Sequence, residues 1–148
     1  MSTPMDNGHS AKRLLGILAQ VNRRMMVMRT SLASRPEVNA ANRTCDVLDY
    51  HDPMAPEEKF WDFEAYVEVE TSTGEFCWSL ELRAKAETWE VYRRIFLAQE
   101  TGGDMVANLP DVSFASFELF ALGVLPLVDE FAESTRDFDF SSRRLGDK

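Results

Sequence analysis

Two runs of alternating apolar and polar residues, joined by a short turn, constrain the fold of this chain more than any other feature. The first run covers residues 61–71, the second covers residues 76–85, and the turn is Ser72–Glu75. A period of two is typical of a β-strand with one buried face, so the segment predicts a β-hairpin over residues 61–85. The largely apolar face comprises Trp61, Phe63, Ala65, Val67, Val69, Thr71, Phe76, Trp78, Leu80, Leu82 and Ala84.

The other face of the predicted hairpin is acidic. Its candidate partner-binding residues are Asp62, Glu64, Tyr66, Glu68, Glu70 and Glu81. We expect this face to point to water, because a slip of one residue in the pairing would exchange the two faces and bury the carboxylates. The expected cross-strand pairs are Val69–Trp78, Val67–Leu80, Ala65–Leu82, Glu64–Arg83 and Asp62–Lys85.

An amphipathic helix is predicted over residues 10–32, with Ser10 as its N-cap. A continuous apolar seam follows one side of it, with the spacing of a surface helix packed on a core. The same spacing is the a/d pattern of a coiled coil, so a homodimer through this helix is the alternative. The seam comprises Leu14, Leu18, Val21, Met25, Met28 and Leu32.

The segment between this helix and the hairpin has a mixed composition. Residues 34–43 resemble a loop, residues 44–51 fit a short strand, and residues 52–58 are rich in turn-forming residues. If residues 44–51 form a strand, Cys45, Asp49 and His51 share one face of it, which would permit a small site. No paired cysteine or histidine spacing supports a metal site there, so a structural role is the simpler interpretation.

Two further helices are predicted after the hairpin. Residues 86–101 have aromatic and aliphatic side chains at helical spacing, followed by Gly102–Gly103 as a stop. Residues 104–111 are expected to be a connector. A nearly uncharged helix is predicted over residues 113–134, with a break at Gly123–Pro126.

These elements predict an α+β fold. An antiparallel sheet centred on the hairpin at about 61–85 would carry the N-terminal amphipathic helix and the C-terminal helices on one face. At 148 residues and 45% hydrophobic composition, the chain is expected to form a single globular domain over residues 1–148. Flexible ends are expected at about 1–9 and 136–148, with Phe138 and Phe140 as candidates to dock on the body.

Charge is distributed unevenly along the chain. Residues 1–43 carry seven Lys or Arg against Asp6 and Glu37, a net charge of +5, which leaves −14 for residues 44–148 of a chain whose total is −9. Phosphates would be repelled by such an acidic body, so nucleic acid is excluded as a partner and a basic protein is favoured. No apolar run reaches the roughly 20 residues of a membrane helix, so no membrane contact is expected.

Cysteine usage and the amino terminus predict the compartment. Cys45 and Cys77 are too few for a disulfide framework. The first residues lack the basic and apolar regions of a signal peptide. These features predict a cytoplasmic protein with free thiols.

Motifs of catalysis are missing from the sequence. It contains no glycine-rich phosphate loop and no Gly-x-Ser-x-Gly elbow. We therefore expect no catalytic residues, no metal and no cofactor, and a protein that is not an enzyme.

The leading functional hypothesis is a small acidic protein-binding module that docks a basic partner through its acidic sheet face. A bacterial immunity or inhibitor protein that neutralises a basic toxin is one such protein. A secretion-type chaperone or adaptor, acting as a dimer through the first helix, is the first alternative. A small-molecule or metal-binding enzyme that uses Cys45, Asp49 and His51 is the second.

Overall fold

The structure, a computed structural model, describes residues 8–52, 55–85, 88–99 and 102–141. It contains an N-terminal helix, a five-stranded sheet and a C-terminal helix, which confirms the α+β fold. The elements are α1 (Gly8–Ala33), β1 (Val38–Asp52), β2 (Ala55–Thr71), β3 (Gly74–Lys85), β4 (Thr88–Gln99), β5 (Gly102–Phe114) and α2 (Phe117–Ser134).

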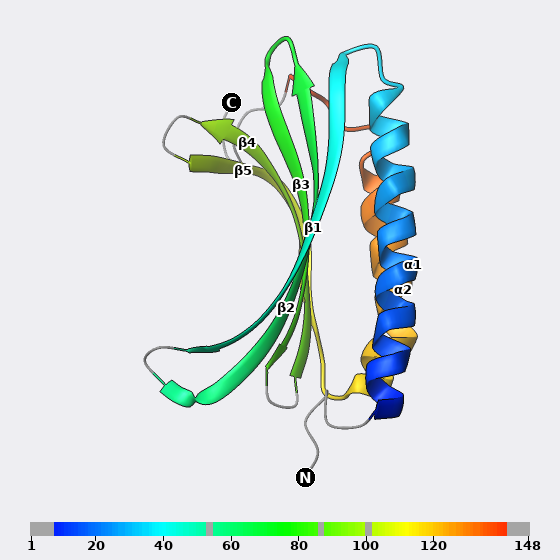
Figure 1. The fold of residues 1–148 in the computed structure, drawn as a ribbon. Coiled ribbons are helices and arrows are strands. Elements are labelled where there is room, and N and C mark those ends of the chain that lie inside the picture. Colours follow the sequence, from blue (N-terminus) through cyan, green and yellow to red (C-terminus); the bar gives the residue numbers. More distant parts are fainter. Residues whose placement is uncertain (1–7, 53–54, 86–87, 100–101, 142–148) are drawn as a thin grey trace.

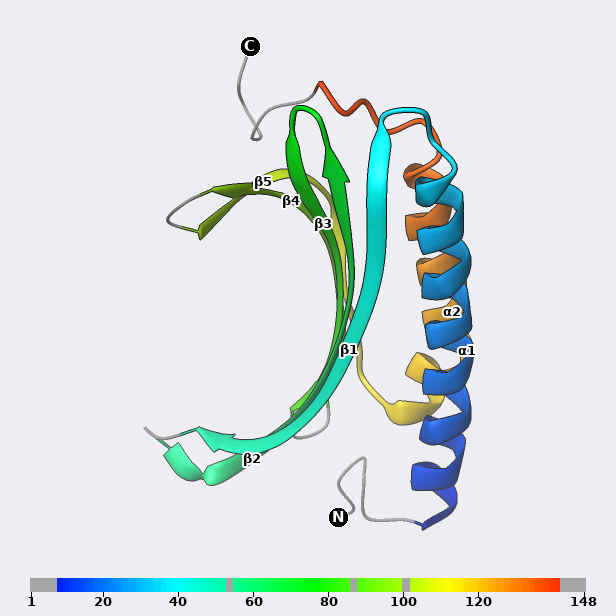
Figure 2. The same ribbon diagram turned by 45° about the horizontal axis from the view of Figure 1, so that its top comes forward.

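The strands form one antiparallel sheet in the order β1-β2-β3-β4-β5, so each strand pairs with its neighbour in sequence. α1 packs on β1 and β2, α2 packs on β4 and β5, and both cover the same side of the sheet (Figure 1). The strands bend away from the helices along their length, which leaves the other side concave (Figures 1 and 2). We call this concave side the open face. On β2, β3 and β4 it carries Glu68, Cys77 and Phe96 and every second residue before and after each of them. On β5 it carries Met105 and Asn108.

The core lies between the sheet and the two helices. Alternating residues of β2 and β3 point into it, including Trp78, which is fully buried. The predicted seam of α1 meets this layer: Leu18 is partly buried and the other five seam residues are buried. Helix α1 is therefore a surface helix that packs on the body of its own chain, as the first interpretation of its spacing predicted.

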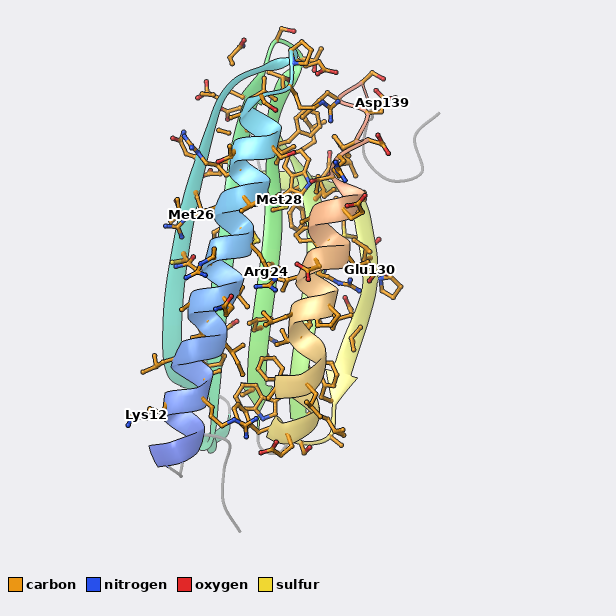
Figure 3. The ribbon with its side chains drawn as sticks, turned by 90° about the vertical axis from the view of Figure 1, so that its right-hand side faces the viewer. Lys12, Arg24, Met26, Met28, Glu130 and Asp139 are labelled. Atoms are coloured by element: carbon orange, nitrogen blue, oxygen red, sulfur yellow. The ribbon has the colours of Figure 1, made fainter. Side chains whose placement is uncertain are left out.

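The two helices run side by side in the same direction (Figure 3). Arg24 of α1 forms an ion pair with Asp129 of α2, with 2.8 Å between Nε and Oδ1. A second ion pair joins Arg13 and Glu118, nearer the N-terminal ends of the two helices. Lys12 and Met26 lie on the side of α1 that is turned away from α2 (Figure 3). Among the described residues, no helix is long and apolar enough to cross a membrane.

Helix α2 is continuous, so the predicted break at Gly123–Pro126 is wrong. The helix begins after Ser116, whose hydroxyl accepts a hydrogen bond from the Leu119 N–H. Pro126 lies inside the helix and is exposed. The carbonyl that a proline leaves without its helical donor belongs to the residue four positions earlier, here Leu122, whose side chain is also exposed, so water can serve it.

The helix predicted over residues 86–101 is also wrong, because residues 88–99 of this segment form β4. Its inward row contains Trp89, Val91, Arg93, Ile95 and Leu97, and the residues that alternate with them, such as Tyr92, Arg94 and Phe96, lie on the open face. The predicted connector at 104–111 belongs to β5, which pairs with β4 through two register shifts. Gly102–Gly103 opens that strand and does not end a helix.

The first part of the sheet is also more extensive than predicted. Residues 38–43 of the expected loop lie in the long strand β1. In the segment expected to be rich in turns, residue 52 ends β1 and residues 55–58 begin β2. The hairpin of β2 and β3 is confirmed, but its register differs by two residues. A shift of two preserves the faces, because the side-chain period is two. The observed pairs are Val69–Phe76, Val67–Trp78, Ala65–Leu80, Glu64–Glu81 and Asp62–Arg83.

The reason for the shift is the size of the turn. Thr71 pairs with Gly74, so the loop contains only Ser72 and Thr73. Gly74 has φ of 149°, a backbone conformation that residues with a side chain rarely adopt. Glycine at this position therefore permits the tight connection that sets the pairing.

One charged side chain enters the core from the inward row of β4. Arg93 is 1% exposed and lies beneath α2. Its guanidinium donates to the carbonyl oxygens of Pro110 at 2.9 Å and Leu127 at 3.2 Å, and to Glu130 Oε1 at 2.5 Å. Arg93 thus ties β4, β5 and α2 together at the point where β5 departs from regular pairing.

Residues 135–141, part of which the sequence assigned to the flexible end, carry two phenylalanines that dock on the core. The ring centroids of Phe138 and Trp78 are 5.1 Å apart, and those of Phe140 and Phe76 are 5.3 Å apart. Arg35, which follows α1, donates to the Phe138 carbonyl at 2.8 Å and lies over the Phe140 ring. This segment closes one end of the core.

Candidate functional site: the open face of the sheet

All six residues that the sequence predicted as partner-binding lie on β2 and β3 with their side chains on the open face. Glu68 and Glu70 are exposed, as predicted, and Glu64, Tyr66 and Glu81 are half-buried. The Tyr66 hydroxyl donates to Glu64, the next open-face residue along β2. The structure therefore brings these six residues onto one surface, but only part of that surface is freely hydrated.

Asp62 corrects the expectation that the whole acidic row points to water. Only 1% of it is exposed. It lies opposite Arg83, and one of its oxygens is 3.5 Å from Arg83 Nη2, so the predicted pairing of Asp62 with Lys85 is wrong. The pairing with Arg83 follows directly from the two-residue change in register.

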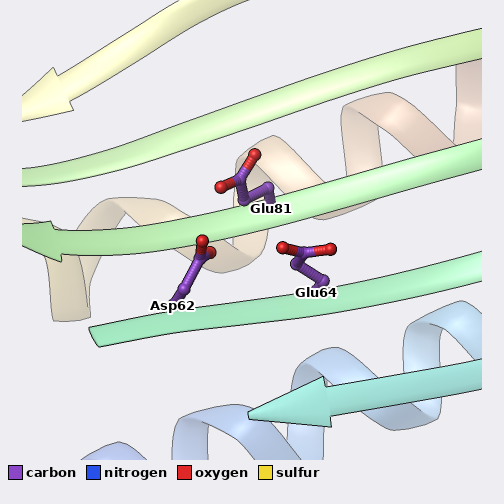
Figure 4. Close-up of side chains that lie close together, drawn as sticks. All are labelled: Asp62, Glu64 and Glu81. Atoms are coloured by element: carbon purple, nitrogen blue, oxygen red, sulfur yellow. The ribbon is translucent and has the colours of Figure 1, made fainter. Parts of the chain in front are cut away.

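Asp62, Glu64 and Glu81 form a carboxylate cluster (Figure 4). One carboxylate oxygen of each lies within 4.8 Å of the other two. Burial, a hydrogen bond with Glu81 and the negative charge of Glu81 raise the pKa of Asp62 to about 7. Asp62 therefore retains its proton at pH values well above those at which a carboxylic acid usually ionises.

Arg83 holds this cluster together. Its Nη2 lies 2.6 Å from Glu81 Oε2, in addition to its contact with Asp62. The same guanidinium lies 5.7 Å from the ring centroid of Tyr92, whose hydroxyl donates to Glu90 at 2.8 Å. Burial and this bond to Glu90 raise the pKa of Tyr92 to about 12. The end of the open face near Asp62 is thus a network of paired charges.

The carboxylate cluster offers oxygen ligands of the kind that hard cations prefer. However, the Arg83 guanidinium already contacts two of its three members, so it supplies the positive charge that a metal ion would bring. Cys45, proposed from the sequence as part of a small site, packs against the core on the helix side of β1. The side chains of Asp49 and His51 lie outside the part of the chain that the structure describes.

The β4–β5 half of the open face was missed by the sequence analysis, because residues 86–111 were assigned to a helix and a connector. Here a shallow hollow of about 370 Å³ opens between the two strands. Arg94 lies 4.7 Å from the ring centroid of Tyr92 and 3.4 Å from Asp111 Oδ2. The hollow is lined by Arg94, Phe96, Gly103, Met105, Asn108 and Asp111.

The strand register arranges these side chains in rows across the sheet. One row contains Glu68 on β2, Cys77 on β3, Phe96 on β4 and Met105 on β5. Neighbouring strands are about 4.8 Å apart, so Glu68 and Phe96 are separated by about 10 Å. Along this row the side chains therefore change from acidic on β2 to apolar on β4 and β5.

Cys77 lies at the middle of this row and is half-buried. Its side chain is on the open face, as predicted, whereas Trp78 is on the buried face. Burial and the charge of Glu68 raise the pKa of the Cys77 thiol to about 12. A thiol with so little thiolate is a poor nucleophile, so Cys77 acts here as a small neutral contact.

Comparison with known proteins adds no functional information. No protein-family model, curated protein or solved structure matches this chain.

Proposed function

We propose that this chain is a non-enzymatic module that binds a basic protein partner through the open face. The observation that carries the proposal is the concave sheet surface on which Glu68 and Glu70 are exposed beside the half-buried Tyr66. Concave surfaces with one sign of charge attract partners of the opposite charge and accelerate their encounter. A tyrosine at the centre of such a surface suits the role of an anchor.

The two parts of the acidic surface have different roles in this proposal. Glu68 and Glu70 provide the accessible charge that steers the partner. The network around Asp62 and Arg83 is already paired, so it provides a fixed shape rather than free charge. An immunity or inhibitor protein that blocks a basic toxin fits this surface. The free thiols of Cys45 and Cys77 support a reducing compartment such as the cytoplasm.

The alternative of a dimeric chaperone or adaptor receives less support from the packing. The seam of α1 that would form a coiled coil is covered by the sheet of the same chain. A homodimer through this helix would have to use the outer side instead, where Leu15, Met26 and Val27 are exposed. These side chains do not form the continuous a/d stripe that a coiled coil needs.

The proposal is tested with a displayed library of random peptides selected on the wild-type protein. We expect the selected peptides to be rich in Lys and Arg. Their affinity should fall at least about tenfold at low salt for the double variant Glu68→Lys, Glu70→Lys, mainly through a slower association rate, and the loss should shrink at high salt.

The matched control carries the same change of charge elsewhere. Glu133 and Asp137 are exposed near the end of α2, so Glu133→Lys with Asp137→Lys alters the net charge equally. Peptides that lose affinity equally for both double variants would show that only the total charge matters. Selected peptides without basic residues would equally reject the proposal.

A further inference from the structure

We infer that the partner segment of the open face is an amphipathic helix that lies across the strands, with basic residues over β2 and β3 and a large apolar residue over the hollow between β4 and β5. This inference rests on the proposed function and adds the chemistry and the direction of the bound segment. It follows from the register, the curvature of the sheet and the distribution of charge.

The curvature sets the direction of the segment. The strands bend along their length, so the trough of the open face runs perpendicular to them (Figures 1 and 2). A rod in this trough crosses β2, β3, β4 and β5 in turn. The three strand spacings amount to about 14 Å, which is the length of about ten residues of α-helix.

The side chains at the middle of the trough are small, which leaves room there for a bound segment. Cys77 and Ser79 are the small open-face residues at the centre of β3. They lie between Glu68 and Tyr66 on one side and Phe96 and Arg94 on the other. A helix laid on β3 therefore meets little obstruction and contacts larger side chains on both flanks.

The chemistry of the two ends differs. On the β2 and β3 side, Glu68 and Glu70 are exposed, and Glu75 lies directly opposite Glu70. On the β4 and β5 side, Phe96 and Met105 pair across the strands and are half-buried, so each retains apolar surface that a partner can cover. Charge complementarity selects Lys or Arg at the first end, and the apolar surface of Phe96 and Met105 selects a large apolar side chain at the second.

The spacing of the partner residues follows from the register. Glu68 and Phe96 are two strands apart, about 10 Å. Residues separated by seven positions on an α-helix lie on the same side and about 10 Å apart. The partner helix thus presents a basic residue and a large apolar residue about two turns apart.

Two synthetic helical peptides test the inference. The first has two Lys residues in one turn and a Leu two turns further along, and the second has Ser in place of that Leu and the same charge. We expect the Leu peptide to bind the wild-type protein at least about tenfold more tightly, because a buried leucine contributes that much or more. Fluorescence anisotropy of labelled peptides measures both affinities.

Protein variants locate the effect. Phe96→Ser should remove the difference in affinity between the two peptides. Met105→Ser should reduce the same difference, and a thermal melt of each variant checks that it folds. In the Glu68→Lys, Glu70→Lys variant both peptides should bind more weakly.

The outcomes separate this inference from the proposed function. Equal affinity of the two peptides for the wild-type protein, with weaker binding of both to the Glu68→Lys, Glu70→Lys variant, overturns the inference and keeps the function. An affinity difference that persists in both Phe96→Ser and Met105→Ser also overturns the inference. If neither peptide responds to the Glu68→Lys, Glu70→Lys change, both the function and the inference are wrong.

Discussion

Replacing Arg93 with methionine tests how α2 is fixed to the sheet. Arg93 is 1% exposed, whereas its partner Glu130 keeps 59% of its side chain exposed. The substitution retains an apolar stem of similar length but removes the donor to the Pro110 and Leu127 carbonyls. Losing a donor costs an acceptor about 1–3 kcal/mol, with partly buried acceptors at the lower end. Two partly buried acceptors lose their donor here, so Arg93→Met should lower the free energy of unfolding by about 2–4 kcal/mol.

Urea denaturation followed by tryptophan fluorescence measures this loss, because Trp89 is buried beneath α2 beside Phe120. The matched change Glu130→Ala removes only an exposed partner and should cost at most about 1 kcal/mol. Arg93→Lys should fall between the two, since an ammonium group cannot reach all three acceptors. The reasoning fails if Arg93→Met is within about 1 kcal/mol of wild type, or if Glu130→Ala is equally damaging.

Two further predictions concern titratable groups of the open face. Since the folded protein holds the Asp62 proton up to about pH 7 and the unfolded chain releases it near 3.8, stability should fall as pH rises between these values. The stability advantage of Asp62→Asn over wild type in urea denaturation should therefore be smallest near pH 4 and grow up to about pH 7; an advantage that does not grow over this range contradicts the prediction. Cys77 should react with iodoacetamide at pH 8 far more slowly than free cysteine, because its pKa is about 12. Reaction at the rate of free cysteine would show that the thiol is not shielded.

The faces of the hairpin could be predicted from the sequence because the alternation on β2 and β3 is nearly unbroken. Its exact register could not, because a shift of two residues leaves every face unchanged and is decided by the geometry at Gly74. That shift has chemical consequences. It places Asp62 opposite Arg83 and Glu64 opposite Glu81, which creates the carboxylate cluster that the predicted pairs did not contain.

The strand β4 was mistaken for a helix for a specific physical reason. Trp89, Tyr92 and Phe96 have helical spacing, and Arg93 interrupts the apolar alternation that would have indicated a strand. The sequence gives no sign that this arginine is buried, because its acceptors come from β5 and α2. In β5, the two register shifts break the period of two in the same way, so the β4–β5 half of the open face could not be predicted.

The central claim, that a basic segment binds the open face, is tested most directly by paramagnetic NMR. A Lys-rich peptide carrying a nitroxide label is added to the isotope-labelled protein, and the broadening of backbone amide signals is measured. The proposal predicts the strongest broadening at Glu68, Cys77 and their neighbours on β2, β3 and β4, with α1 and α2 shielded behind the sheet. Strongest broadening in α1 or α2 would place the partner on the opposite side of the molecule and contradict the proposal.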